Sequence, residues 1–220
     1  MKEWAQMCFS PEADILTGVL VCAVGIDALN HVTTPEQRPL AALPLVLGAH
    51  QLTETFVWWS LQGKVSPSVG DAATMLYLAV AFLLPLWVPL AIRGVETSVA
   101  RRRLMGLLAG AGAVVSAAYL GSALAGPVGS AVGGNYIIYE VSLPLSAVMG
   151  TLYVVTTCGA PLMSSDRIIR DFGMVNLVAV AFIILMVFEG LTSLWCAWAA
   201  VTSVAIAVYL RRQERAFATA

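Results

Sequence analysis

The segment from His50 to Trp58, HQLTETFVW, places a histidine, an acid and an indole within an otherwise apolar stretch. In a helix, His50, Glu54 and Trp58 lie on one face, and Gln51 lies beside Glu54. An ionisable side chain within a hydrophobic span is costly, so a functional site is the first hypothesis for Glu54 and pairing with a polar neighbour is the alternative. Because a carboxyl group in a low-dielectric environment favours its neutral form, Glu54 is suited to donate a proton.

The neighbours of Glu54 are expected to assist it. His50 and Gln51 lie within one helical turn, from which they can orient the carboxyl group or return a proton to it. A lone helix histidine is more often a structural partner than a ligand, and that reading of His50 stays open. Trp58 shares the Glu54 face and is expected to line a pocket, although a place in an interfacial aromatic belt is the alternative.

The composition is that of an integral membrane protein. The 220 residues are 59% hydrophobic and 11% charged, and the mean hydropathy is +0.83, outside the range of ordinary soluble domains. The sequence has no basic face for nucleic acid. Four cysteines show no CxxC pair or metal-ligand spacing, so no metal and no cofactor are predicted.

A membrane-crossing helix needs about 20 apolar residues, and seven segments meet that length. We therefore predict an all-α, single-domain bundle of seven transmembrane helices over residues 13–32, 39–61, 72–92, 104–125, 136–158, 172–189 and 191–210. Only Glu189 and Gly190 separate the last two segments, which indicates a tight hairpin or a displaced boundary. Pro85, Pro89 and Pro144 are expected to kink their helices.

The basic residues divide unequally between the two sides of the predicted bundle. The connections after the first, third and fifth segments and the C-terminal tail carry ten of them, and the opposite side carries only Lys2 and Lys64. The positive-inside tendency then places the N-terminus outside and the C-terminus in the cytoplasm. We expect a multi-pass protein of a bacterial plasma membrane.

This orientation brings four acids into the outer half of the bundle. Glu140 falls about one turn into segment 136–158 and is a candidate second acid or cation stabiliser. Glu189 is a candidate binding residue, although a capping role at the interface is favoured for Glu189 and Asp14. Aromatic side chains predicted at this level form candidate pocket walls: Tyr77, Tyr119, Tyr139, Phe182 and Trp195.

Several chemistries lack the residues they need. A retinal Schiff base requires a lysine inside the bundle, and both lysines lie outside the predicted helices. No carboxylate cluster such as DDxxD is present to hold Mg²⁺ on a diphosphate. HQLTE is not the HExxH zinc motif, and no GxSxG elbow occurs. Metal-dependent prenyl transfer and serine hydrolysis are therefore disfavoured.

The opening Met7-Cys8-Phe9-Ser10, followed by Leu43-Pro44-Leu45 and HQLTETFVWW, resembles a family of small bacterial membrane proteins that carry HQxxE in their second helix. The resemblance covers most of the chain, and residues 1–6 look like an extension. Length, helix number and N-terminus also resemble the membrane-bound terpene cyclases of indole-terpenoid, or meroterpenoid, biosynthesis. That resemblance implies cyclisation of a prenyl chain already attached to an aromatic acceptor.

The residues fit a metal-independent cyclisation started by protonation. Glu54 would protonate a terminal alkene or epoxide of a lipophilic substrate such as a farnesylated indole, and Trp and Tyr rings would stabilise the cation. A proton-coupled small-molecule transporter is the first alternative, because intramembrane acids and histidines are equally normal there. A non-enzymatic seven-helix sensor or assembly protein is the second. The sequence leaves open whether the protein has protein partners.

Overall fold

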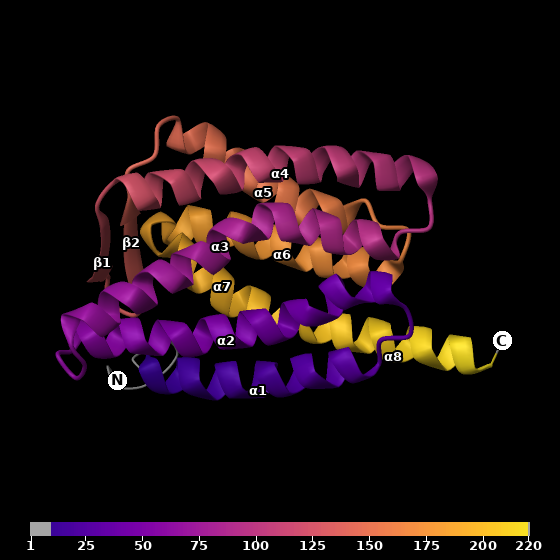
Figure 1. Ribbon diagram of the computed structural model, residues 1–220, viewed down its shortest axis with the longest axis horizontal. Coiled ribbons are helices and arrows are strands. Elements are labelled where there is room, and N and C mark those ends of the chain that lie inside the picture. Colours follow the sequence, from indigo (N-terminus) through magenta and orange to yellow (C-terminus); the bar gives the residue numbers. More distant parts are fainter. Residues whose placement is uncertain (1–9, 220) are drawn as a thin grey trace.

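The computed structural model describes residues 10–219, and the predictions that concern Lys2 and the Met7-Cys8-Phe9 opening lie outside the described residues. Helices dominate this part of the chain (Figure 1): α1 (Pro11–Asn30), α2 (Arg38–Leu61), α3 (Pro67–Val95), α4 (Val99–Ala125), α5 (Ser146–Leu162), α6 (Arg167–Met186), α7 (Leu191–Thr202) and α8 (Val204–Ala218). Two short 3-10 helices, η2 (Pro35–Gln37) and η3 (Phe188–Gly190), and a hairpin of β1 (Val128–Val132) and β2 (Ile137–Val141) complete it.

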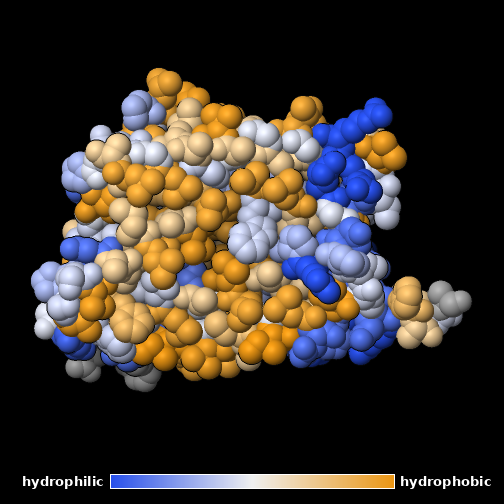
Figure 2. Space-filling view, viewed as in Figure 1, coloured by the Kyte–Doolittle hydropathy of each residue, from blue (hydrophilic) through white to orange (hydrophobic). Residues whose placement is uncertain are grey.

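Five helical segments are long and apolar enough to cross a membrane: Pro35–Leu61, Pro67–Val95, Val99–Ala125, Arg167–Met186 and Phe188–Ala218. A shorter apolar helix covers Ser146–Leu162. Figure 2 shows an apolar surface over the middle of the bundle, with hydrophilic residues gathered toward its two ends. The prediction of a helical protein with membrane-length apolar helices is confirmed, and the count of seven spans stays a prediction.

Small residues let the first helices approach closely. A side chain at Gly48 of α2 would meet the backbone of Cys22 and Gly18 in α1, and one at Gly25 would meet the backbone of Leu45. Gly112 of α4 lies in the same way against the carbonyl group of Pro85 in α3. Among the glycines of α4, Gly112 makes this close contact, whereas no atom lies within 4 Å of a side chain placed at Gly110 or Gly121.

The predicted helix over residues 136–158 is wrong in its first part. Ile137–Val141 is a strand paired antiparallel with Val128–Val132, and Gly134 at the turn has a φ of 88°. α5 begins only at Ser146, after Leu145 in a left-handed conformation, so Pro144 precedes the helix and does not kink it. The Gly133-Gly134 turn between segments rich in valine and isoleucine was the available sequence signal for a hairpin.

The boundaries of the last helices also differ from the predicted ones. α6 starts at Arg167, earlier than predicted, because the Asp166 side chain caps it by accepting hydrogen bonds from the backbone N–H groups of Ile168 (2.8 Å) and Ile169 (3.3 Å). η3 makes the predicted break between α6 and α7. A second break at Ser203 separates α7 from α8, which continues past residue 210 to Ala218.

The connections divide between the two ends of the bundle (Figure 1). The hairpin, the α2–α3 turn and η3 lie at one end, which we call the hairpin end. The α1–α2, α3–α4 and α5–α6 connections and the C-terminal part of α8 lie at the other, which we call the arginine end. Arg211 of α8 there pairs with Asp27 of α1 through hydrogen bonds of 2.9 Å and 2.6 Å. The arginine-rich segments named above therefore meet at one end.

Candidate functional site

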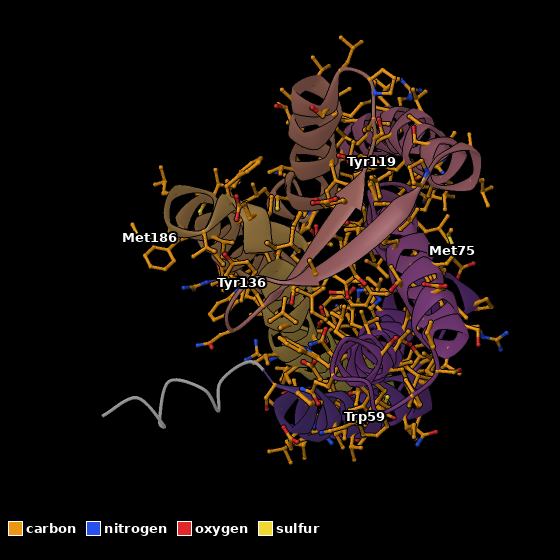
Figure 3. All side chains as sticks on the ribbon, turned by 90° about the vertical axis from the view of Figure 1, so that its left-hand side faces the viewer. Trp59, Met75, Tyr119, Tyr136 and Met186 are labelled. Atoms are coloured by element: carbon orange, nitrogen blue, oxygen red, sulfur yellow. The ribbon has the colours of Figure 1, made fainter. Side chains whose placement is uncertain are left out.

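Glu54 is buried in the hairpin half of the bundle, with an exposed fraction of 1%. The hydroxyl group of Tyr139 donates a hydrogen bond to Glu54 Oε1 at 3.1 Å, and Ser193 of α7 lies beside the same carboxyl group. Side chains alternate along β2, so Ile137 and Tyr139 face the bundle while Ile138 and Glu140 face away. The hairpin, seen from its own end in Figure 3, lies across the ends of the helices. Tyr139, on β2, reaches the acid through this hydrogen bond.

Asp14 is a second buried acid that the sequence interpretation assigned to capping. That interpretation is wrong, because Ser10 caps α1 and Asp14 is 5% exposed. Gln51 Nε2 donates a hydrogen bond to Asp14 Oδ1 at 3.3 Å, and the Asp14 and Glu54 carboxyl groups are close enough to interact electrostatically. Asp14 shares a helix face with Gly18 and Gly25, and this spacing was the sequence signal for its position against α2.

His50 takes part in a stack of rings. It lies on Tyr77 of α3 with ring centroids 3.8 Å apart and planes inclined by 12°, and Tyr77 lies on Tyr139 at 4.7 Å. His50 is 1% exposed, and neither ring nitrogen has a hydrogen-bond partner among the described residues. The stack holds His50 and Tyr139 in place on either side of Tyr77, next to the acids.

Unpaired polar atoms are concentrated in this acid cluster, which we define as Asp14, His50, Gln51, Glu54 and Tyr77. Within residues 10–219, buried polar atoms without a hydrogen-bond partner include Asp14 Oδ2, both nitrogens of His50, Gln51 Oε1, Thr55 Oγ1 and the Tyr77 hydroxyl. Buried polar groups are normally hydrogen-bonded. The cluster therefore retains capacity to bind a polar group or to exchange a proton.

An aromatic cavity of about 90 Å³ lies beside the cluster, between α3, α4, α5 and α7. Its aromatic walls are Phe82, Tyr119, Tyr153 and Trp195. The rings are in contact, since Tyr119 stacks on Phe82 with centroids 4.7 Å apart and Tyr153 meets the edge of Trp195 at 5.3 Å. The predicted wall residues Tyr119 and Trp195 are thus together, although they come from α4 and α7.

Cys196 of α7 connects the aromatic cavity with the acid cluster. It lines the cavity, packs in one hydrophobic cluster with Tyr77 and Phe82, and is near enough to Glu54 for electrostatic interaction. Ala81 and Phe82, which follow Tyr77 on α3, line the same cavity. Cys196 therefore lies close both to the Glu54 carboxyl group and to the aromatic cavity.

Three predicted site residues, Glu140, Phe182 and Glu189, lie away from both the acid cluster and the aromatic cavity. Glu140 was placed wrongly on a helix; it is exposed on the outer face of β2, opposite Gly129, in an open groove of the hairpin. Phe182 on α6 is 61% exposed, and Glu189 is exposed in η3. Trp58 is buried with Val57, Ala73 and Ile137 beneath the hairpin, and it lies beside Asp14.

The metal-ligating side chains of residues 10–219 form no group of three or more His, Cys, Asp or Glu suited to hold an ion. A family model described as "Family of unknown function (DUF6629)" matches residues 7–220. The chain therefore belongs to this family. No curated protein and no solved structure gives a significant match to the chain.

Proposed function

We propose that this member of the family is a membrane terpene cyclase that starts catalysis by protonating a prenylated, lipophilic substrate such as a farnesylated indole. The observation that supports the proposal is the buried Glu54 carboxyl group, hydrogen-bonded by Tyr139 and close to Cys196, which lines an aromatic cavity. An acid held away from water and next to polarisable rings has the parts that cation cyclisation requires.

Glu54 is the proton donor in this mechanism. Its O–H bond breaks as the π electrons of the terminal alkene form a new C–H bond, which leaves a tertiary carbocation. A second double bond attacks that carbon and closes the ring. The final cation loses a proton to the Glu54 carboxylate, so the acid is restored and the product is an isomer of the substrate.

The remaining residues orient the proton donor and stabilise the carbocation. Phe82, Tyr119 and Trp195 face the migrating charge, and each cation–π contact is worth about 0.5–2 kcal/mol. Gln51 donates a hydrogen bond to Asp14, and the Asp14 carboxyl group is close enough to Glu54 to interact with it electrostatically. Tyr139 donates a hydrogen bond to one oxygen of Glu54 and so helps to fix the orientation of the carboxyl group.

Entry of the substrate is assigned to the gap between α5 and α7. Gly150, Val154 and Leu191, which line the cavity from these helices, are half-buried. At about 90 Å³ the cavity is smaller than small-molecule pockets, which span about 300–1,000 Å³. We therefore expect α5 and α7 to separate as a prenyl chain enters from the lipid of a bacterial plasma membrane.

The orientation proposed for the protein follows the arginine count. The arginine end faces the cytoplasm and the hairpin end faces outward. The acid cluster then lies in the outer half of the membrane, on the side of the hairpin.

The experiment is to incubate membranes containing the protein with a farnesylated indole and to search for an isomer of equal mass and different retention. Wild type is expected to form it and Glu54→Gln to lose it, because the amide cannot donate a comparable proton. Glu12→Gln, an exposed change at the start of α1, is the matched control and keeps activity. Unchanged substrate with both wild type and Glu54→Gln contradicts the proposal.

A proton-coupled small-molecule transporter is the second candidate. The observation that favours it is the set of unpaired polar atoms around Asp14 and His50, which suits binding of a polar solute. Substrate-dependent proton flux in sealed vesicles, without a change of substrate mass, would select this function. A sensor or assembly protein instead predicts that Glu54→Gln alters stability and nothing else.

A further inference from the structure

Three unpaired oxygen atoms lie along the contact between α1 and α2, toward the hairpin end. The two helices run side by side (Figure 1), and their glycines bring the backbones together. Asp14 of α1 and Gln51 and Thr55 of α2 are each 5% exposed or less. Asp14 Oδ2, Gln51 Oε1 and Thr55 Oγ1 have no hydrogen-bond partner among the described residues. Buried polar atoms are normally paired, so these three oxygens are available to a ligand.

The spacing of residues on α2 places Thr55 against Asp14. Gln51 Nε2 donates a hydrogen bond of 3.3 Å to Asp14 Oδ1, and Trp58 also lies beside Asp14. Gln51 and Trp58 are two helical turns apart on one face of α2. Thr55 lies between them on that face, one turn after Gln51. Its side chain is therefore directed toward Asp14 and the unpaired oxygen of Gln51.

The hydroxyl group of Thr55 does not make the bond that other helical threonines of this chain make. Thr53, Thr156 and Thr157 each donate a hydrogen bond to the carbonyl oxygen four residues earlier, at 2.9 Å, 2.9 Å and 2.7 Å. Within residues 10–219, Thr55 Oγ1 has no such partner. Its hydroxyl group is thus free to bind a ligand between α1 and α2.

The chemistry of the three oxygens selects a small cation. Gln51 Oε1 can only accept hydrogen bonds, and so can the oxygens of an ionised Asp14. Among the described residues, no arginine or lysine forms an ion pair with Asp14. Water would satisfy the oxygens but leave the charge of Asp14 unbalanced. A single carboxylate balances one positive charge, and hard oxygen ligands of this kind suit an alkali-metal ion.

The three oxygens lie close to the surface at the hairpin end. α1 begins at Pro11, so Asp14 is about one turn from the start of the helix. Glu12, at that start, is exposed. A cation therefore reaches Asp14 without crossing the apolar middle of the bundle, and the carboxylate of Glu12 attracts it.

We propose that Asp14, Gln51 and Thr55 form a binding site for one alkali-metal cation such as Na⁺, with Asp14 Oδ2, Gln51 Oε1 and Thr55 Oγ1 as its ligands. The cation joins α1 to α2 and balances the charge of Asp14. The site goes beyond the proposed function, because cation binding requires neither a prenylated substrate nor a proton transfer.

The test is thermal unfolding of the purified full-length chain in detergent, with choline chloride replaced stepwise by NaCl or KCl at constant ionic strength. Since the cation binds the folded state, the melting temperature should rise by about 3–6 °C for each tenfold increase in Na⁺ above its dissociation constant. Equal melting temperatures in all three salts at every concentration would overturn the proposal and leave water or a proton as the occupant.

Two matched threonine substitutions locate the cation. Thr55→Val keeps the shape of the side chain but removes a proposed ligand, and it is expected to raise the dissociation constant for Na⁺ about tenfold. Thr53→Val, on the same helix, removes a hydroxyl group that is bonded to its own backbone and should keep the wild-type response. Asp14→Asn is expected to abolish the response. A wild-type response to Na⁺ in folded Thr55→Val or Asp14→Asn would overturn the assignment of these ligands.

Discussion

The Tyr139 hydroxyl group donates a 3.1 Å hydrogen bond to Glu54 Oε1, although 85 positions separate the two residues in the chain. Tyr139 lies on the β1–β2 hairpin and Glu54 lies within helix α2. The hydrogen bond therefore links the hairpin to the buried acid. Any motion of the hairpin changes the surroundings of Glu54. This coupling underlies the first prediction.

Tyr139→Phe removes only the hydroxyl group and is expected to slow isomer formation and lower the free energy of unfolding by about 1 kcal/mol. Rates are measured with membranes, and stability by thermal unfolding in detergent. Tyr136→Phe is the control on the same hairpin, because the Tyr136 ring packs against Gly190 outside the acid cluster. Equal rates and melting temperatures for Tyr139→Phe and wild type would show that this hydrogen bond has no role.

Asp14→Asn and Glu54→Gln are expected to be non-additive. The two carboxyl groups interact, so replacing one changes the environment of the other, and their coupling free energy should fall in the range of about 0.5–3 kcal/mol. A double-mutant cycle by chemical unfolding measures it. The control cycle pairs Glu54→Gln with Asp27→Asn, at the arginine end of α1, where additivity is expected. Additivity in both cycles would argue against a shared acid site.

Gly112→Ala is expected to destabilise the protein by about 1–3 kcal/mol, because the new methyl group would overlap the Pro85 carbonyl group of α3. Gly110→Ala is the matched control on the same helix, since no atom lies near a side chain placed there. Alanine is the better helix former by about 1 kcal/mol, so Gly110→Ala should leave stability unchanged or raise it. Melting temperatures that shift in the same direction would contradict the close α3–α4 contact.

Glu96 joins the α3–α4 and α5–α6 connections, and its contribution to stability should depend on pH. Ser165 donates to it through its hydroxyl group at 2.6 Å and its backbone N–H at 2.8 Å, and Ser98 donates a backbone N–H at 2.8 Å. Burial alone would raise the pKa of the Glu96 carboxyl group, but these hydrogen bonds outweigh it and hold the pKa below its usual value.

The lowered pKa of the Glu96 carboxyl group determines how its contribution to stability changes with pH. The stabilisation is complete above the usual glutamate pKa of about 4.3 and is lost as the pH falls through the lower folded value. Glu96→Gln should therefore lower the melting temperature at neutral pH and approach wild type in acid. Asp171→Asn, at an exposed ion pair with Arg167, is the control and should change stability by less than about 1 kcal/mol. A constant gap between wild type and Glu96→Gln at every pH would refute the assignment.

Much of the helical architecture was predictable because its causes are local. Runs of apolar residues define the membrane-length helices, and the one-turn spacing of His50, Gln51 and Glu54 is a property of α2 alone. These three side chains are buried because they lie on the part of α2 that contacts α1, α3 and the hairpin. The hairpin was missed because its valines and isoleucines are also compatible with a membrane helix. The Gly133-Gly134 turn was the local signal against a helix, and the pairing of residues 128–132 with residues 137–141 shows the hairpin.

The sequence by itself determined a helical, membrane-compatible chain with a polar group of residues centred on Glu54, since hydropathy and helical periodicity act over neighbouring positions. Tertiary structure alone decided which residues meet that group. Asp14 rather than Glu140 became the second acid because α1 packs on α2 through glycines, while the alternation of β2 turned Tyr139 inward and Glu140 outward. Such contacts depend on helix packing and strand register, which no local spacing specifies.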